Sequence, residues 1–280
     1  MQYNDNDLRK LQLLELRILK EIDRVCRELG ITYFLDSGSV LGALRHGGFI
    51  PWDDDIDLGM PRADYDRFVA EAPALLGEEY VVSTPETSPH QAALFGKVWL
   101  RGTRFATEET IEAGFDQGIF VDLLPYDALS SDPATAAKQR RDCRFWQSVS
   151  YLSHAKSIVV PHKGALGAIE RAACGAAHLA ARGLYSPEKI VSRFNKAATC
   201  GNDPSLASDD LVVMAYATYE PYARSMMLPT STVTFEGCEF PAPADPEAFL
   251  RQLYGEWQKL PPVEARRNHA PVELDFGPYA

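Results

Sequence analysis

The chain has 280 residues, of which 46% are hydrophobic and 24% charged, and its formal net charge is −11 at pH 7. A globular composition this acidic lacks the basic face that nucleic-acid binding requires, so we expect no nucleic-acid partner. Five cysteines without zinc-ligand spacing or a disulfide framework favour a cytoplasmic location, and a polar N-terminus without any long apolar run predicts neither a signal segment nor a transmembrane segment.

The first predicted element is an amphipathic helix over residues 8–29, because Leu11, Leu14, Ile18 and Ile22 follow three- and four-residue spacing. Local composition, turn residues and helix-start signals predict the elements that follow. In chain order they are a strand at 31–35, a helix at 40–45, a strand at 55–58, a helix from 61 to about 76, strands at 80–84, 94–101, 103–107 and 118–124, helices at 133–153, 164–184 and 187–198, a hairpin at 233–240 and a helix at 246–254.

Strands and helices mix in the first half of the chain, and helices dominate the second. This order predicts an α/β (α+β) fold. We expect a catalytic core over residues 1–130. A mostly helical region with a hairpin and a C-terminal tail, residues 131–280, would pack against that core.

An acidic cluster coincides with the strand predicted at 55–58, since four of the five residues from 53 to 57 are Asp. Such a concentration of like charge is costly unless a cation or solvent neutralises it. Side chains at i and i+2 of a strand point the same way, so Asp55 and Asp57 should share a face, with Asp54 facing away. Oxygen ligands of this kind suit Mg²⁺ or Mn²⁺.

The cluster has two other interpretations. A solvated acidic turn is disfavoured by the apolar Ile56 and Leu58. An EF-hand calcium loop would also begin with alternating aspartates, but Leu58 stands where that loop requires glycine and Asp64 where it requires glutamate. The EF-hand interpretation is therefore excluded.

Asp122 lies within the apolar strand predicted at 118–124, where a charged side chain is costly unless it is paired or binds a metal. If this strand neighbours residues 55–58, Asp122 completes a metal triad or serves as a general base. The alternative is an ion pair with a buried Lys or Arg. Lys97, also among apolar strand residues, would neutralise a phosphate or pair with an aspartate.

Ser37, Gly38 and Ser39 form a small-residue turn that opens a predicted helix. Backbone N–H groups and hydroxyls at such a turn are donors for a phosphate. With the acidic cluster close by in sequence, the segment predicts a site where a metal and a phosphate meet.

Residues 35–43, 48–57 and 120–122, together with the tail at 253–257 followed by Pro261 and Pro262, resemble the LicD family. This family includes bacterial phosphocholine transferases and is related to the fukutin-type phosphotransferases. The resemblance spans roughly residues 8–269 and is most specific in the Pro-Trp-Asp-Asp-Asp-Ile-Asp motif at 51–57. Residues 130–230 carry little of it.

The resemblance implies a nucleotidyltransferase-like fold and the metal-dependent transfer of a phospho-substituent from a CDP-linked donor to a hydroxyl acceptor. The acceptor would be a glycan precursor of the cell surface or a small molecule. Carried onto this chain, the family's site residues are a phosphate loop (Ser37, Gly38 and Ser39), two metal ligands (Asp55 and Asp57) and a third carboxylate (Asp122). The loop departs from the family, since many members have Gly-Gly-Thr where this chain has Asp-Ser-Gly-Ser.

These residues do not identify which CDP-linked donor the protein uses. Phosphocholine is the first expectation, and its cationic head group would contact aromatic faces, for which the candidates are Trp52, Trp99, Tyr126, Tyr254 and Trp257. The tail residues Arg266, Arg267 and His269 are candidates for contacting phosphate. The alternatives are CDP-ribitol or CDP-glycerol as donor, true nucleotidyl transfer, and a metal- or nucleotide-binding scaffold without activity.

Overall fold

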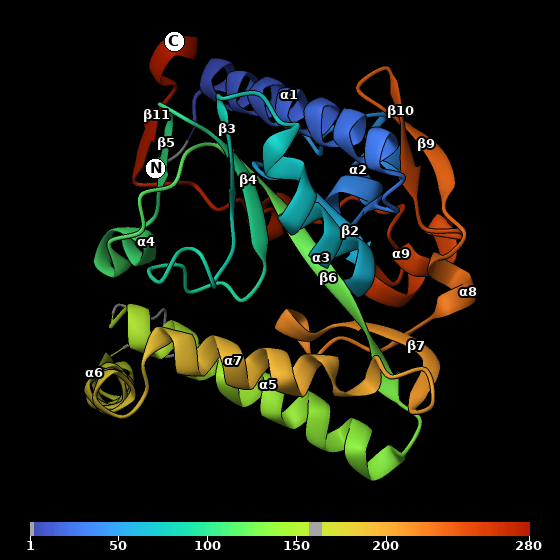
Figure 1. Cartoon of the computed structure of the whole chain (residues 1–280). Coiled ribbons are helices and arrows are strands. Elements are labelled where there is room, and N and C mark those ends of the chain that lie inside the picture. Colours follow the sequence, from blue (N-terminus) through green and yellow to red (C-terminus); the bar gives the residue numbers. More distant parts are fainter. Residues whose placement is uncertain (1–2, 157–163) are drawn as a thin grey trace.

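A mixed sheet of seven strands forms the centre of the molecule (Figure 1), which we describe from a computed structural model over residues 3–156 and 164–280. Its strands run in the order β1, β2, β6, β4, β3, while β7 pairs with the distal part of β6 and β8 with β7. Their bounds are β1 Phe34–Leu35, β2 Asp57–Pro61, β3 Tyr80–Ser83, β4 Gly96–Leu100, β6 Phe120–Ser130, β7 Ala207–Val213 and β8 Tyr222–Ala223.

Two small sheets flank the central one: β9 (Ser231–Phe235) with β10 (Cys238–Ala242), and β5 (Arg104–Ala106) with β11 (Glu273–Asp275). The helices cover the sheet, with α1 above it in Figure 1, against β4 and β6, and the contacting pair α5 and α7 below it. Their bounds are α1 Asp5–Leu29, α2 Ser37–His46, α3 Arg62–Glu71, α4 Glu108–Ala113, α5 Pro133–His154, α6 Gly164–Leu184, α7 Pro187–Ala198, α8 Arg224–Met227 and α9 Pro246–Tyr254.

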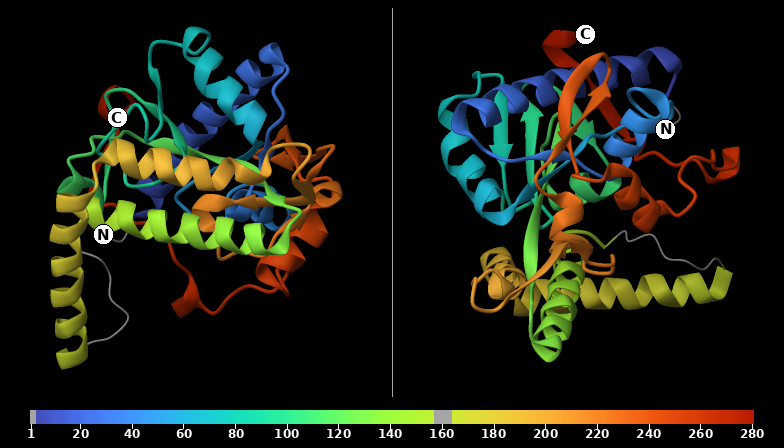
Figure 2. Two further views of the ribbon diagram at one scale, coloured as in Figure 1. Left: turned by 60° about the horizontal axis from the view of Figure 1, so that its bottom comes forward. Right: turned by 90° about the vertical axis from the view of Figure 1, so that its right-hand side faces the viewer.

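The mixed α+β class predicted from the sequence is confirmed, and most predicted elements are present within a few residues. Two differences matter for the site. β6 is buried along its whole length and continues to Ser130, beyond the predicted end at 124. β7 and α4 form where no element was predicted. Figure 2 shows α6 projecting away from the body of the molecule.

The pairing register of three strands determines where the acidic residues lie. β2 and β6 are parallel and pair Asp57 with Asp122, while β4 and β6 are antiparallel and pair Lys97 with the same Asp122. Paired residues of neighbouring strands project from the same face of a sheet. Asp57, Asp122 and Lys97 therefore lie side by side on three adjacent strands.

After α9 the chain returns toward these residues as an irregular segment, residues 255–272, which we call the C-terminal strap. It ends where Val272 donates a backbone hydrogen bond to Ala106 and β11 joins β5. Of the helices in the described ranges, none is both long enough and apolar enough to span a bilayer.

Candidate active site

A cavity of about 650 Å³ lies at the start of β2, and Asp55, Asp57 and Asp122 all line it. The parallel pairing of β2 with β6 brings Asp122 to residues far away in the sequence. β2 begins at Asp57 rather than at residue 55, so Asp55 reaches the cavity from the segment before the strand. The structure therefore brings together the three carboxylates that the sequence nominated.

Burial dominates the electrostatics of this cluster. It raises the pKa of Asp55 to about 6 and that of Asp57 well above its usual value, and neighbouring carboxylates raise the pKa of Asp57 further. Burial also raises the pKa of Asp122, although Lys97 opposes the rise. Three buried carboxylates whose charges repel one another are oxygen ligands of the kind that a hard divalent cation such as Mg²⁺ prefers.

Asp53 adds to the same negative field. Burial, with the charges of Asp55 and Asp54, raises the pKa of Asp53 to about 8. Its carboxylate also explains the glycine at position 38, since a Cβ there would lie 2.9 Å from Asp53 Oδ2. Gly38 lets residues 37–39 lie directly against the acidic cluster.

The turn at residues 37–39 is held in place by Asp36, the N-cap of α2. Asp36 accepts a hydrogen bond from the Ser37 backbone N–H at 2.7 Å and another from the Tyr126 hydroxyl at 2.8 Å. Ser37 takes a positive φ of 44°, and Ser37 and Gly38 both line the cavity. Two of the three predicted loop residues thus lie where the N-terminus of α2 could bind an anion.

Ser39 has a different place from the one predicted. Its side chain is buried, and its Oγ accepts a hydrogen bond from the Asp57 backbone N–H at 2.9 Å. The hydroxyl therefore ties α2 to the first residue of β2, and Ser39 does not line the cavity as Ser37 and Gly38 do. Ser39 positions Asp57.

Replacing Ser39 with alanine is expected to lower the free energy of unfolding by about 1–2 kcal/mol, because the buried Asp57 N–H loses its acceptor. A shift of Asp57 should also lower kcat by about tenfold. The matched variant Ser37→Ala alters a hydroxyl at the cavity wall and should change KM with little effect on stability. Urea denaturation and steady-state kinetics of both variants test this, and a Ser39→Ala protein as stable and active as the parent would contradict it.

Lys97 forms an ion pair with Asp122, which is one of the two roles predicted for it from the sequence. Its Nζ lies 2.6 Å from Asp122 Oδ1 and 3.7 Å from the centroid of the Phe120 ring. Trp52 lines the large cavity as predicted for a substrate-binding residue, but the guanidinium of Arg266 lies 4.4 Å from the centroid of its ring. One face of Trp52 is thus covered by the strap.

Of the other aromatic and basic candidates, some line the cavity and some do not. Tyr254, Trp257 and Arg267 line the cavity. Tyr126 instead supports Asp36, and Trp99 lies within β4.

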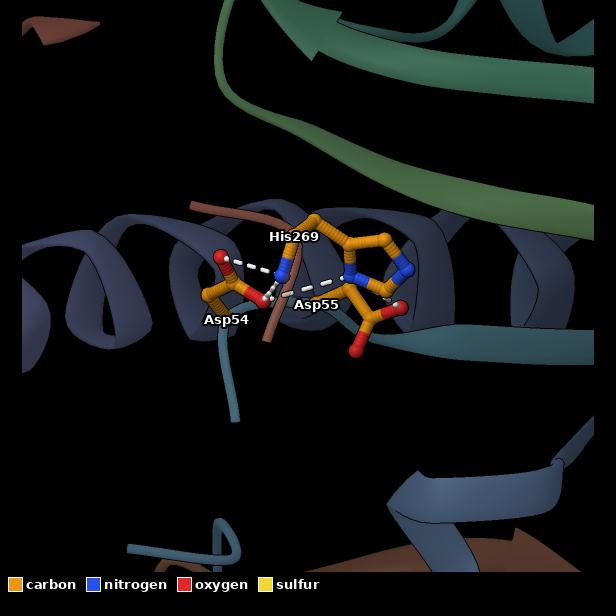
Figure 3. A group of neighbouring side chains, drawn as sticks. All are labelled: Asp54, Asp55 and His269. Carbon is orange, nitrogen blue, oxygen red and sulfur yellow. Dashed lines mark hydrogen bonds and ion pairs between the residues drawn. The ribbon is translucent and has the colours of Figure 1, made fainter. Parts of the chain in front are cut away.

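The strap is anchored by Asp54, which is fully buried. Asp54 accepts hydrogen bonds from the backbone N–H groups of His269 and Ala270, each at 2.8 Å, and from the Tyr3 hydroxyl at 2.7 Å. Figure 3 shows the His269 ring between Asp54 and Asp55, with Nδ1 3.2 Å from Asp54 Oδ1 and 3.5 Å from Asp55 Oδ2. Sequence reasoning placed Asp54 facing away and did not foresee this anchor.

These contacts determine the charges of Asp54 and His269. Although burial would raise it, the pKa of Asp54 is held below its usual value by hydrogen bonds from His269 and Tyr3. The hydrogen bond to Asp54 and the charge of Asp55 raise the pKa of His269 to about 9, against the effect of burial. The imidazole is therefore a cation at neutral pH.

Asp54, Asp55 and His269 also offer ligand atoms within 4.8 Å of one another, which is close enough to hold a metal ion. Asp54, however, already accepts three hydrogen bonds, and the imidazole Nδ1 faces it as a donor. We assign Asp54 and His269 to fastening the strap, while Asp55 lines the cavity.

Glu15 of α1 lies beneath the cluster and was not singled out from the sequence. It is fully buried, and neither carboxyl oxygen has a hydrogen-bond partner within the described residues. Burial and then the charge of Asp55 raise its pKa well above the usual value. A neutral carboxyl in this place adds no further charge to the cluster.

Without a divalent cation, the free energy of unfolding is expected to fall as the pH rises from about 5 to about 9. The folded-state pKa values of Asp55 (about 6) and Asp53 (about 8) exceed their unfolded values, so the folded chain binds more protons and loses stability as the pH rises through them. His269 acts in the same direction, because its contribution is complete below an unfolded pKa of about 6.5 and lost as the pH passes about 9.

Urea denaturation in EDTA across this pH range measures the decline, and saturating Mg²⁺ should flatten it by binding the folded state. Stability that rises with pH in EDTA over the same window would contradict the assignment.

The chain is similar to one family model and to several known proteins. Residues 30–149 match the family model described as "LicD/FKTN/FKRP, nucleotidyltransferase domain". Over 275 residues the chain is 29% identical to the Lipopolysaccharide cholinephosphotransferase LicD of Haemophilus influenzae, covering 94% of this chain and 95% of that protein. Over 49 residues it is 51% identical to the Ribitol 5-phosphate transferase FKRP of Mus musculus and of Homo sapiens, covering 16% of this chain and 10% of each of those proteins.

Proposed function

Because this chain belongs to the LicD family, we propose that it transfers a phospho-substituent, foremost phosphocholine, from a CDP-linked donor to a hydroxyl acceptor. The relatives support a transferase of substituted phosphate groups. The observation that carries the proposal is the meeting of Asp55, Asp57 and Asp122 with Ser37 and Gly38 at one cavity. It joins carboxylates suited to a divalent cation with an anion-binding helix terminus.

Three features of the cavity suit the donor. Asp55, Asp57 and Asp122 would hold Mg²⁺ or Mn²⁺, which when bound supplies charge neutralisation of the diphosphate and polarisation at phosphorus. The N-terminus of α2 orients a phosphate through backbone N–H groups and its dipole. Arg267 and Lys259 line the same cavity and add positive charge on the side of the strap.

The chemical step is a substitution at phosphorus. The acceptor oxygen forms a bond to the phosphorus that carries the substituent, the bond from this phosphorus to the CMP oxygen breaks, and CMP leaves. Asp122 either accepts the proton of the acceptor hydroxyl or completes the ligand set, and its ion pair with Lys97 favours the ionised form that both roles need. The product is a phosphodiester.

CDP-ribitol is the second candidate donor, favoured by the short stretch of 51% identity to the Ribitol 5-phosphate transferase FKRP. CDP-glycerol and true nucleotidyl transfer remain rivals. The acceptor class we propose is a cell-surface glycan precursor or a small molecule bearing a hydroxyl. A nucleotidyltransferase-like core over residues 1–130 belongs to the same proposal.

A thermal-shift panel tests the donor. CDP-choline, CDP-ribitol, CDP-glycerol and CDP-ethanolamine are each added with Mg²⁺ and again with EDTA. We expect CDP-choline to raise Tm most, and only with Mg²⁺, since a ligand that binds the folded state stabilises it. Absence of any shift by all four compounds would contradict the proposed function, and a larger shift by CDP-ribitol would replace phosphocholine as the substituent.

A further inference from the structure

A second cavity of about 180 Å³ adjoins the first at the carboxylates. Asp55, Asp122 and His269 line both cavities, so the two meet beside the proposed position of the reacting phosphorus. Pockets for drug-sized ligands hold roughly 300–1,000 Å³. The larger cavity has room for a nucleotide, whereas the smaller one can take only a short substituent.

Phe and Tyr rings form a large part of the walls of the smaller cavity, which we call the aromatic chamber. They come from the loop before β4, from β5, β6 and α5, and from the segments that follow α4 and β7. The ring residues are Phe95, Phe105, Phe115, Phe120, Tyr151 and Tyr216. The ammonium of Lys97, 3.7 Å from the Phe120 centroid, shows that a cation already lies against one of these faces.

The polar side chains of the chamber are largely committed to partners within the protein. Gln91 donates to the Phe95 carbonyl at 2.5 Å and accepts from Ser83, while Thr107 and Thr110 hydrogen-bond each other's backbone in the capping box of α4. Gln117 Oε1, a buried acceptor, and the hydroxyls of Tyr151 and Tyr216 have no hydrogen-bond partner within the described residues.

Glu109 of α4 supplies a negative charge to the chamber. Its half-buried side chain has neither an ion pair nor a hydrogen bond to another described residue. Asp55 and Asp122 belong to the proposed metal site and Lys97 pairs with Asp122, so Glu109 is the carboxylate of the chamber that neither the metal nor an ion pair uses. An unpaired carboxylate beside aromatic walls suits a small organic cation.

We infer that the aromatic chamber is the head-group subsite of the donor and that it binds an alkylammonium group, with Glu109 as the counter-ion. This inference rests on the proposed function, and it selects an alkylammonium over a polyol substituent. The nucleotide occupies the larger cavity, the carboxylates lie at the diphosphate, and the head group extends into the aromatic chamber.

The test compares two ligands that differ only in charge. Isothermal titration calorimetry with Mg²⁺ measures the binding of CDP-choline and of its neutral isostere CDP-3,3-dimethylbutanol, in which carbon replaces the quaternary nitrogen. The parent protein should bind CDP-choline about tenfold more tightly. In Glu109→Gln this preference should fall to about threefold or less. Glu108→Gln, which alters the exposed neighbour in α4, should keep the full preference.

CDP alone serves as the reference ligand for both proposals. Its Kd should be the same in the parent and in Glu109→Gln, which also shows that the variant is folded. If the parent binds CDP-choline and CDP-3,3-dimethylbutanol equally well, or if Glu109→Gln keeps the full preference for CDP-choline, the assignment of the subsite is wrong. In either case, binding of CDP would still support the proposed function. A parent protein that does not bind CDP would contradict the proposed function and the subsite with it.

Discussion

Replacing Asp55 with asparagine is expected to reduce phosphotransfer by about 10²–10³-fold or more while the protein remains folded. Asp55 is one of three carboxylates that reach the large cavity, and an amide there is a poor ligand for a hard cation. The same change removes one of several buried charges that repel each other. In EDTA the variant should therefore be at least as stable as the parent, although less active.

Two measurements separate these effects. Steady-state rates of CMP release with Mg²⁺ give the loss of activity, and urea denaturation in EDTA gives the stability. Asp209→Asn, the same chemical change at an exposed position of β7, should alter neither. An Asp55→Asn protein with the parent's activity would show that the cluster has another purpose, and one that fails to fold would show that Asp55 is structural.

Replacing Asp54 with alanine is expected to have the largest effect on stability, lowering the free energy of unfolding by roughly 3–5 kcal/mol. The change leaves two backbone N–H groups of the strap and the Tyr3 hydroxyl without their shared, fully buried acceptor, beside a protonated His269. Activity should fall as well, because the strap carries Arg267 and His269 to the cavity.

The matched variant Tyr3→Phe removes a single one of these hydrogen bonds and should cost about 1 kcal/mol. Limited proteolysis should cleave Asp54→Ala within residues 255–272 before the rest of the chain, whereas the parent and Tyr3→Phe resist. If both variants lose the same small stability and keep the strap protected, Asp54 is not its anchor.

Local sequence rules located much of the site. A turn of small residues at 37–39, a run of aspartates at 53–57 and a lone acid at Asp122 each reflect physics that acts over a few residues. The bounds were less exact, since α2 begins at Ser37 rather than at 40 and β2 at Asp57 rather than at 55. The prediction that Asp122 lies beside the acidic cluster depended on the assumption that their two strands are neighbours. In the structure β2 and β6 are parallel neighbours, and Asp57 pairs directly with Asp122. The α+β class was predictable for the same reason, because it depends on the order of local patterns.

What the sequence did not predict depends on contacts between distant residues. Asp54 and His269 are 215 positions apart, and nothing near either residue indicates its partner. Ser39 was assigned to the phosphate because its hydroxyl can accept or donate locally, but the tertiary contact to Asp57 took precedence. Glu15 resembles any polar residue of an amphipathic helix until the acidic cluster is placed against it.

The most direct test of the account uses one donor with two labels. CDP-choline labelled in the choline methyl groups and in the cytosine is incubated with the protein, Mg²⁺ and a hydroxyl acceptor, and both labels are followed into the product and into CMP. We predict that the choline label enters the product and the cytosine label leaves as CMP, with both events lost in EDTA and in Asp55→Asn. Cytosine label in the product, or release of CMP that does not depend on the metal, would contradict the account.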